Sequence, residues 1–202
     1  TSTLSFKFQD LKFDEKALID GVDRRFDVAP DGRVVACIPR NTYEISVYAP
    51  DGTLERVFSR EYESWVRNER AAGIWQSIME TIQSQQAPNA PVSWEETEPD
   101  VEFIRVAPDG RIWVLNSRAM WTETPGAFTY FDVFTADGHF EKQVEVVCEG
   151  NPQEDILFFA GDDLAFMVTG FWDAALSQFG GAGAADDDED AQPMSVICYR
   201  VK

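Results

Sequence analysis

Two arginines stand at the same place in two copies of a repeated sequence, where they could form an anion site. Arg40 follows "VAPDGRVVACIP" and Arg118 follows "VAPDGRIWVLNS", so each lies the same distance after a "PDG" sequence. Two guanidinium groups at equivalent positions can hold a carboxylate or an anionic sugar through paired hydrogen bonds. They can equally form ion pairs with acidic neighbours, and the sequence leaves both alternatives open.

Further candidate binding residues lie close to these positions in the sequence. Trp121 lies three residues after Arg118, and Trp172 lies in the corresponding loop of a third, degenerate copy of the repeat, in which Gly170 takes the place of the arginine. Tryptophan is favoured at contact surfaces because it buries a large area with few rotatable bonds, although packing within the chain is an equal alternative here. The sequence therefore predicts these candidate ligand-binding residues: Arg40, Asn116, Arg118, Trp121 and Trp172.

A run of acidic residues in "FGGAGAADDDEDAQP" is the one segment that suggests a metal ion. Carboxylate oxygens are the ligands that Ca²⁺ prefers, which makes Asp186, Asp187, Asp188 and Asp190 weak candidate ligands. The run lacks the alternating ligands and the fixed turn glycine of an EF-hand, and a solvated flexible loop is the simpler interpretation. We therefore predict no cofactor, with Ca²⁺ as the alternative.

Histidine, the usual base in nucleophilic catalysis, occurs only once. The chain has one histidine, His139 in "TADGHF", and no nucleophile motif or phosphate-binding glycine loop. A histidine-based triad or a site with several histidine ligands is therefore hard to build. Carboxylates such as Glu95, Glu96, Glu98 and Asp100 could form an acid–base pair, but acids are expected on so acidic a chain. The sequence favours a binding protein and leaves enzymatic activity open.

Charge and hydropathy exclude several classes of partner. The chain of 202 residues has 36 acidic and 17 basic side chains, a net charge of −19, which would repel a nucleic acid. No apolar run is long enough for a transmembrane segment, and "TSTLSFKFQD" does not have the pattern of a signal peptide. Three widely spaced cysteines indicate neither a disulfide framework nor a zinc site.

Repeated hairpin signals define the elements that must position the candidate residues. Strand-prone runs flank each "DG" turn, in which glycine supplies the left-handed conformation that closes a hairpin. Residues 24–58 therefore predict four strands in series, and residues 101–148 repeat the pattern. A last unit over residues 154–202 predicts three strands and a long acidic loop at 179–192.

The remaining segments are predicted to be a lead-in and an insertion. Residues 1–23 alternate apolar side chains as lead-in strands would, and residues 59–100 form an insertion and linker. Trp75, Ile78, Met79 and Ile82 recur at helical spacing, which predicts an amphipathic helix at about 60–85. We expect Trp75 to pack this helix onto the strands.

Self-similar four-stranded units are typical of a β-propeller, and a β-sandwich of hairpins is the alternative. Because strand connections alternate between the two ends of an antiparallel sheet, the short turns must share one end. The long connections must share the other: residues 39–44, 59–100, 117–128 and 170–193. Long loops on a rigid scaffold usually carry binding residues. We therefore predict a small-molecule or protein site on this long-loop face.

The segments "VAPDGRIWVLNS" and "FDVFTADGHFEKQV" resemble blades of the NHL type, and residues 24–202 are similar to the C-terminal half of bacterial six-bladed propeller proteins. The resemblance implies an all-β fold and a periplasmic or extracellular protein; nothing else indicates its location. About three blades cannot close a ring, so it also implies a second half-propeller or a second copy of the chain.

Two alternative functions follow, the first of them from the long-loop face, the placement of the tryptophans and the absence of nucleophile–histidine motifs. One is a non-enzymatic binding or scaffold propeller. The other is a divalent-metal-dependent hydrolase or lactonase of the propeller type. Asn116 stands at the strand end where some propeller lactonases place metal-binding side chains.

Overall fold

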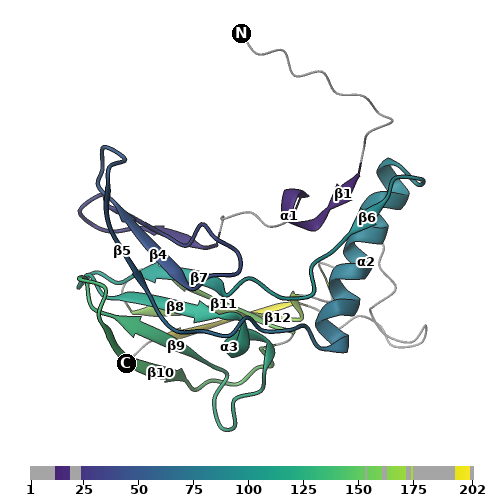
Figure 1. The fold of residues 1–202 in the computed structure, drawn as a ribbon. Helices are drawn as coiled ribbons and strands as arrows, with labels where there is room; N and C mark the ends of the chain where they lie inside the picture. The colour runs from purple at the N-terminus through teal and green to yellow at the C-terminus, as the bar shows by residue number, and fades with distance from the viewer. Residues whose placement is uncertain are drawn as a thin grey trace.

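Three antiparallel sheets stacked face on face make up most of the computed structural model, and one long helix lies against their ends (Figure 1). The structure describes residues 12–18, 24–152, 154–160, 163–171, 174 and 194–200. The predicted all-β class with a helical insertion is confirmed. No helix within these ranges combines the length and the apolar character that crossing a membrane requires.

Each sheet is a simple antiparallel meander in chain order. The first sheet consists of β2 (Phe26–Val28), β3 (Val34–Ala36), β4 (Glu44–Tyr48) and β5 (Leu54–Ser59). The second consists of β7 (Val101–Val106), β8 (Ile112–Asn116), β9 (Thr129–Phe134) and β10 (Phe140–Val146). The third consists of β11 (Ile156–Ala160), β12 (Leu164–Thr169) and β13 (Ser195–Arg200). The predicted units of four, four and three strands therefore form.

The "DG" turns close the hairpins as predicted. Their glycines, Gly32, Gly52, Gly110 and Gly138, all have φ of 85° or 86°, the left-handed region that favours glycine. In the first three of these turns the aspartate before the glycine supports the turn: Asp109 Oδ1, for example, accepts a hydrogen bond of 3.1 Å from the Arg111 backbone N–H. The hairpins are therefore specified locally.

Replacing these glycines with alanine should destabilise the protein in a graded series. At Gly52 a new Cβ meets nothing within 4 Å, so the left-handed backbone alone costs about 1 kcal/mol. At Gly110 the Cβ would lie 3.2 Å from the Ala136 Cβ, a slightly larger cost. At Gly138 it would lie 2.5 Å from the Phe58 ring, which adds overpacking of about 1–3 kcal/mol. Urea unfolding measures the series; equal losses at Gly52 and Gly138 would contradict the turn geometry.

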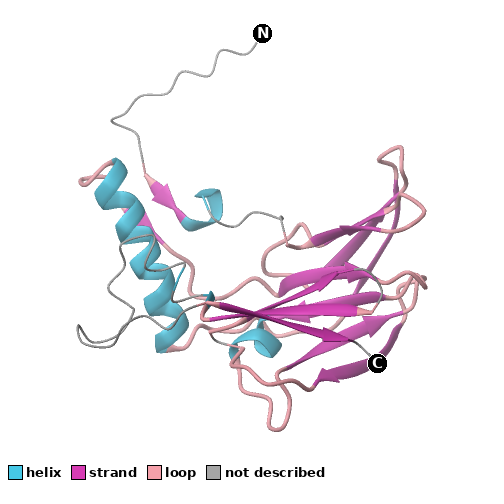
Figure 2. Ribbon diagram, turned by 180° about the vertical axis from the view of Figure 1, so that it is seen from behind, coloured by secondary structure: helices cyan, strands magenta, loops and turns pink. Residues whose placement is uncertain are grey.

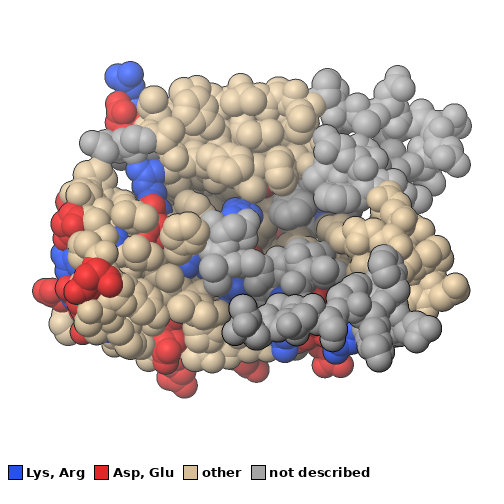
Figure 3. Space-filling model, turned by 90° about the horizontal axis from the view of Figure 1, so that it is seen from above, with Lys and Arg blue, Asp and Glu red and all other residues tan. Residues whose placement is uncertain are grey.

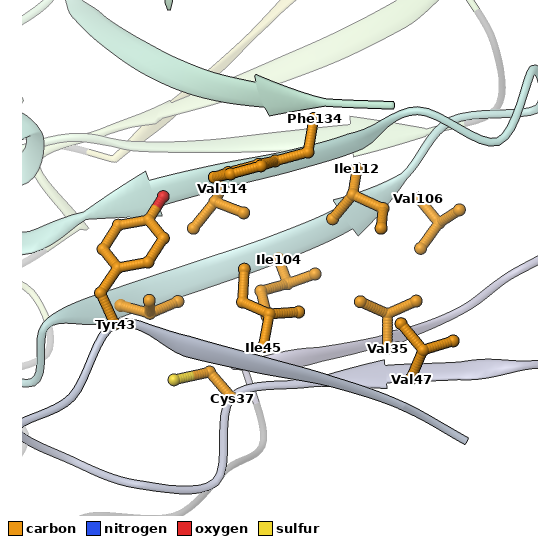
Figure 4. Packing of buried hydrophobic residues seen from close by; sticks show 11 residues of the cluster. Val35, Cys37, Tyr43, Ile45, Val47, Ile104, Val106, Ile112, Val114 and Phe134 are labelled. Carbon is orange, nitrogen blue, oxygen red and sulfur yellow. The ribbon is translucent and has the colours of Figure 1, made fainter. Parts of the chain in front are cut away.

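Buried side chains of opposing faces hold the sheets together. Val35, Ile45 and Val47 of the first sheet pack against Ile104 and Ile112 of the second (Figure 4). On the far side of the second sheet, the ring of Phe131 meets that of Phe159 in the third sheet edge-on, with centroids 5.6 Å apart. The second sheet is therefore covered on both faces.

Strands β2 and β7 also lie side by side along the edges of their sheets. The backbone N–H of Ile104 donates to the carbonyl oxygen of Arg24 at 3.0 Å. The N–H of Val106 donates to Asp27 Oδ2 at 2.7 Å. Each is the first strand of its sheet, so consecutive sheets meet at equivalent edges.

The lead-in and the insertion pair with each other. β1 (Phe13–Asp14) runs parallel to β6 (Val92–Ser93) instead of joining a sheet of the repeat, and α1 (Glu15–Leu18) follows it. The predicted helix is α2 (Glu69–Gln86); it begins at Glu69 because the Asn68 side chain caps it, accepting from the Ala71 N–H at 2.9 Å.

Candidate functional site

The long connections gather at one end of the sheets and the "DG" turns at the other. Figures 1 and 2 show α2 and the short helix α3 (Ser117–Trp121) at the same end, away from the tight turns. We call this the long-loop end; its described segments are residues 39–44, 60–100 and 117–128. The separation follows from the meander order of the strands.

Four buried charged side chains, Glu15, Arg40, Arg67 and Glu98, form a cluster at this end, which we call the buried ion cluster. Arg67 is its centre. Its guanidinium donates to the two carboxylate oxygens of Glu15 at 2.6 and 2.8 Å and to those of Glu98 at 2.9 and 3.1 Å. Such paired geometry uses the planar donor fork that lysine lacks.

Arg40 belongs to this cluster. Its Nη2 donates to Glu15 Oε1 at 3.1 Å and to the carbonyl oxygen of Thr97 at 2.6 Å. Of the two alternatives that the sequence left open, the ion pair with an acidic neighbour is therefore the one that forms at Arg40. The indole N–H of Trp75 donates to Glu98 Oε1 at 2.6 Å, which ties α2 to the cluster, as expected for a packing residue.

Burial and neighbouring charges lower the pKa of one acid here and raise the pKa of two others. Burial raises the pKa of Glu15, but hydrogen bonds from Arg67 and the Glu95 backbone outweigh it and leave the pKa below its ordinary value. Burial raises the pKa of Glu98 above its ordinary value despite Arg67. Burial also raises the pKa of Glu102 to about 8, with a further rise from the charge of Glu98. Glu102 therefore stays protonated near neutral pH in the folded state.

The protein should lose stability as the pH rises from about 4.5 to about 8. Glu102 keeps its proton in the folded chain through this range, whereas in the unfolded chain it ionises near 4.5. The folded state thus binds more protons than the unfolded state, and the free energy of unfolding falls with rising pH. Glu102→Gln should flatten this slope in urea unfolding at stepped pH. The exposed Glu141→Gln is the control, and an unchanged slope in Glu102→Gln would contradict the assignment.

Another buried carboxylate, that of Asp132 on β9, lies outside the buried ion cluster, between the first two sheets. Its Oδ2 accepts from Tyr43 Oη at 2.9 Å and from Asn116 Nδ2 at 3.1 Å. Its Oδ1 accepts from Gln143 Nε2 at 2.9 Å and from Arg60. Fully buried and four-fold bonded, Asp132 joins both sheets and the start of α3.

Both the nitrogen and the oxygen of the Asn116 side-chain amide are hydrogen-bonded within the protein. While its Nδ2 binds Asp132, its Oδ1 accepts from the Ala119 N–H at 2.9 Å and caps α3. This geometry accounts for Asn116 at the end of β8 as an element of structure. A ligand-binding role for it stays a prediction.

Arg118 and Trp121 follow on α3 but differ in exposure. Arg118 is exposed; it donates to the carbonyl oxygen of Glu63 at 3.1 Å and lies 5.9 Å from the centre of the Tyr62 ring. Trp121 is buried and stacks on Trp65, with ring centroids 6.4 Å apart. The structure thus places Arg118 where a ligand can reach it and Trp121 in the core.

The other predicted site residues, Trp172, Asp186, Asp187, Asp188 and Asp190, lie outside the described residues, as does the acidic loop at 179–192. Within the part that is described, no three His, Cys, Asp or Glu side chains converge as metal ligands would.

Two features of the molecule were not predicted. The central roles of Arg67 and Asp132 were missed, although the acid inside the apolar run "YFDVF" is a signal for a buried charge. A cleft of about 310 Å³ also opens at the turn end, between the first and second sheets. Its floor is apolar, with Val35, Val106 and Ile112, and Asp31 and Asp109 stand among its lining residues.

Exposed apolar side chains remain in the insertion. Val66, directly before Arg67, is 67% exposed, and Trp94, directly before the Glu95 that contacts the buried ion cluster, is 45% exposed. Both flank backbone that the cluster fixes. No protein-family model matches the sequence, and no curated protein is significantly similar to it.

Proposed function

We propose that the protein is a non-enzymatic binding scaffold of the β-propeller type, in which the three sheets are consecutive blades and the long-loop end holds a protein partner. The observation that carries this proposal is the buried ion cluster, which fixes the long connections to one another. Binding surfaces on such rigid loops lose little conformational entropy when a partner docks.

The stacking of the sheets supports the propeller part of the proposal. The sheets follow one another in chain order, each a meander, and β2 lies beside β7 at equivalent edges. Blades of a propeller are arranged in this way around a central axis. A β-sandwich would instead place two sheets around one core, whereas here the second sheet has a core on each face.

The chemistry of the exposed residues supports a protein partner. Val66 and Trp94 offer apolar area on fixed backbone, and Arg118 offers a cation on an otherwise acidic chain. Tryptophan and arginine are the residues that most often dominate protein–protein binding energy. The partner we expect has an apolar contact surface with an acidic group.

Site-directed photo-crosslinking in the source cells tests this proposal. A photoreactive residue at Trp94 should capture one stoichiometric partner, and the same residue at Asp109 on the turn end should not. Binding of that purified partner should weaken at least tenfold in Trp94→Ala, as expected for an interface hot spot. Capture only from Asp109, or unchanged binding by Trp94→Ala, would contradict the proposal.

A hydrolase or lactonase is the outcome that would replace this function. Calorimetry with Ca²⁺, followed by a screen of lactones and glycosides, distinguishes it. Tight metal binding together with turnover would overturn the binding-scaffold proposal. The crosslinking experiment is a separate measurement, and its outcome does not depend on these two.

A further inference from the structure

The outer face of the first sheet is apolar and exposed at Phe26 and Val28, while Ala36 on the same face is buried. Opposite the face that packs on the second sheet, the strand register sets Phe26 against Ala36 and Val28 against Val34. Phe26 is 43% exposed and Val28 is 52% exposed. Seen from above, charged side chains gather mainly at the turn end and along one rim, and much of the other described surface is uncharged (Figure 3).

The equivalent face of the second sheet shows what packs on these positions of the repeat. In the two "VAPDGR" copies Val28 corresponds to Val106, and Phe26 corresponds to Ile104. In the second sheet these positions are covered by the first sheet, and Val106 and Ile104 are only 9% and 1% exposed. The outer face of the first sheet therefore has the residues of a blade-to-blade contact, and none of the described strands packs on it as the first sheet packs on the second.

The exposed outer face of the third sheet corresponds to the face of the first sheet that packs on the next sheet in the chain. Its register aligns Phe158, Phe166 and Cys198 across the three strands, and Phe158 and Cys198 are exposed. Counted from the turn between the first two strands, the pair Phe166–Cys198 corresponds to the pair Val35–Val47 of the first sheet. Val35 and Val47 are buried against the second sheet. The outer face of the third sheet therefore has the position of a blade-to-blade contact, and no sheet among the described residues packs on it.

We infer that two copies of this chain close one ring, in which the outer face of the third sheet of each copy packs on the outer face of the first sheet of the other. One chain presents both halves of the contact, so a second copy supplies the complement of each exposed face. Head-to-tail contacts of this kind form a closed two-fold ring when the rotation per chain is half a turn. The inference extends the propeller part of the proposed function and does not depend on the partner at the long-loop end.

Light scattering of the purified chain is the first test. The mass should be twice 22.8 kDa, and it should persist at high salt, because the contact is apolar and screening weakens the repulsion between two acidic copies. A monomer across the accessible concentration range would overturn the inference. Higher oligomers that grow with concentration would also overturn it, since they would mean an open chain of copies.

A charge-pair experiment tests which faces meet. Val28→Lys and Cys198→Asp should each convert the protein to monomers, because each places a charge in an apolar contact. The double variant should restore the dimer, because the lysine introduced in one copy would then face the aspartate introduced in the other. Val147→Lys is the matched control, since Val147 is 74% exposed and lies after β10, outside both faces. Circular dichroism confirms that each variant is folded.

The outcomes are separable. Loss of the dimer in Val28→Lys but not in Cys198→Asp would mean that identical faces pair, which overturns the head-to-tail arrangement. Failure of the double variant to recover would also overturn it. Neither result would affect crosslinking at Trp94, so failure of this inference is distinguishable from failure of the proposed partner site.

Discussion

Arg67→Ala should lose about 3–5 kcal/mol of stability, the largest effect we expect from a single substitution at the long-loop end. Arg67 makes paired hydrogen bonds to both Glu15 and Glu98 in a buried setting. Its removal takes away the guanidinium that bonds both oxygens of each carboxylate, so that Glu15 keeps the hydrogen bond from Arg40 and Glu98 keeps the one from Trp75. Urea unfolding followed by tryptophan fluorescence measures the loss.

Arg70→Ala is the matched control, since Arg70 lies in the first turn of α2 and has a half-exposed side chain 3.5 Å from Glu154. An exposed ion pair of this kind contributes less than about 1 kcal/mol. Equal losses of stability in the two variants would show that the buried ion cluster does not fix the long connections. The proposed rigid surface for a partner would then be contradicted as well.

Asp132→Ala should destabilise the protein by about 3 kcal/mol, because several buried donors lose their acceptor at once. Tyr43 and Asn116 would each keep a polar group without its partner in the interior. The exposed Asp137→Ala serves as the control, since Asp137 sits on the same hairpin with a side chain 82% exposed and should cost less than about 1 kcal/mol.

The loss in Asp132→Ala should also be cooperative with Tyr43→Phe. In a double-mutant cycle the two effects should not add, because both variants break the same hydrogen bond. Strict additivity, or a loss in Asp132→Ala as small as that in Asp137→Ala, would contradict a structural role for the carboxylate between the sheets.

Local signals in the sequence were enough to predict the strands and turns. A hairpin closed by "PDG" or "ADG" is determined by residues within a few positions, and Gly110 and Gly138 adopt the conformation that this requires. The helix over Glu69–Gln86 follows the spacing of Ile74, Ile78 and Met79 along one face. Its start was placed too early because the cap at Asn68 was not considered.

The charged network could not be predicted in the same way. Glu15 lies in the lead-in, Arg40 in the connection 39–44, and both Arg67 and Glu98 in the insertion. Nothing in the sequence of so acidic a chain marks Glu15 and Glu98 as buried. The equivalence of Arg40 and Arg118 was real in the repeat but did not extend to their surroundings. Arg40 is buried and bonded to Glu15 of the lead-in and to Thr97 of the insertion, while Arg118 is an exposed side chain on a helix whose other residues are buried.

The strand partner of the lead-in could not be predicted either, because it lies in the insertion. Phe13 alternates with its neighbours as a blade strand would, yet it is buried beside Met79 of α2 and pairs with Val92. A strand-like pattern gives the secondary structure of such a segment but not its partner, because any apolar groove can bury the same face.

A crystal structure of the assembled protein tests the central claim most directly, that the three sheets are consecutive blades of a ring. We predict that it will show Phe166 and Cys198 of one copy packed on Val28 and Val34 of the other, at two equivalent contacts around one axis. A crystal structure in which either outer face is open to solvent in the assembly that exists in solution would contradict the claim.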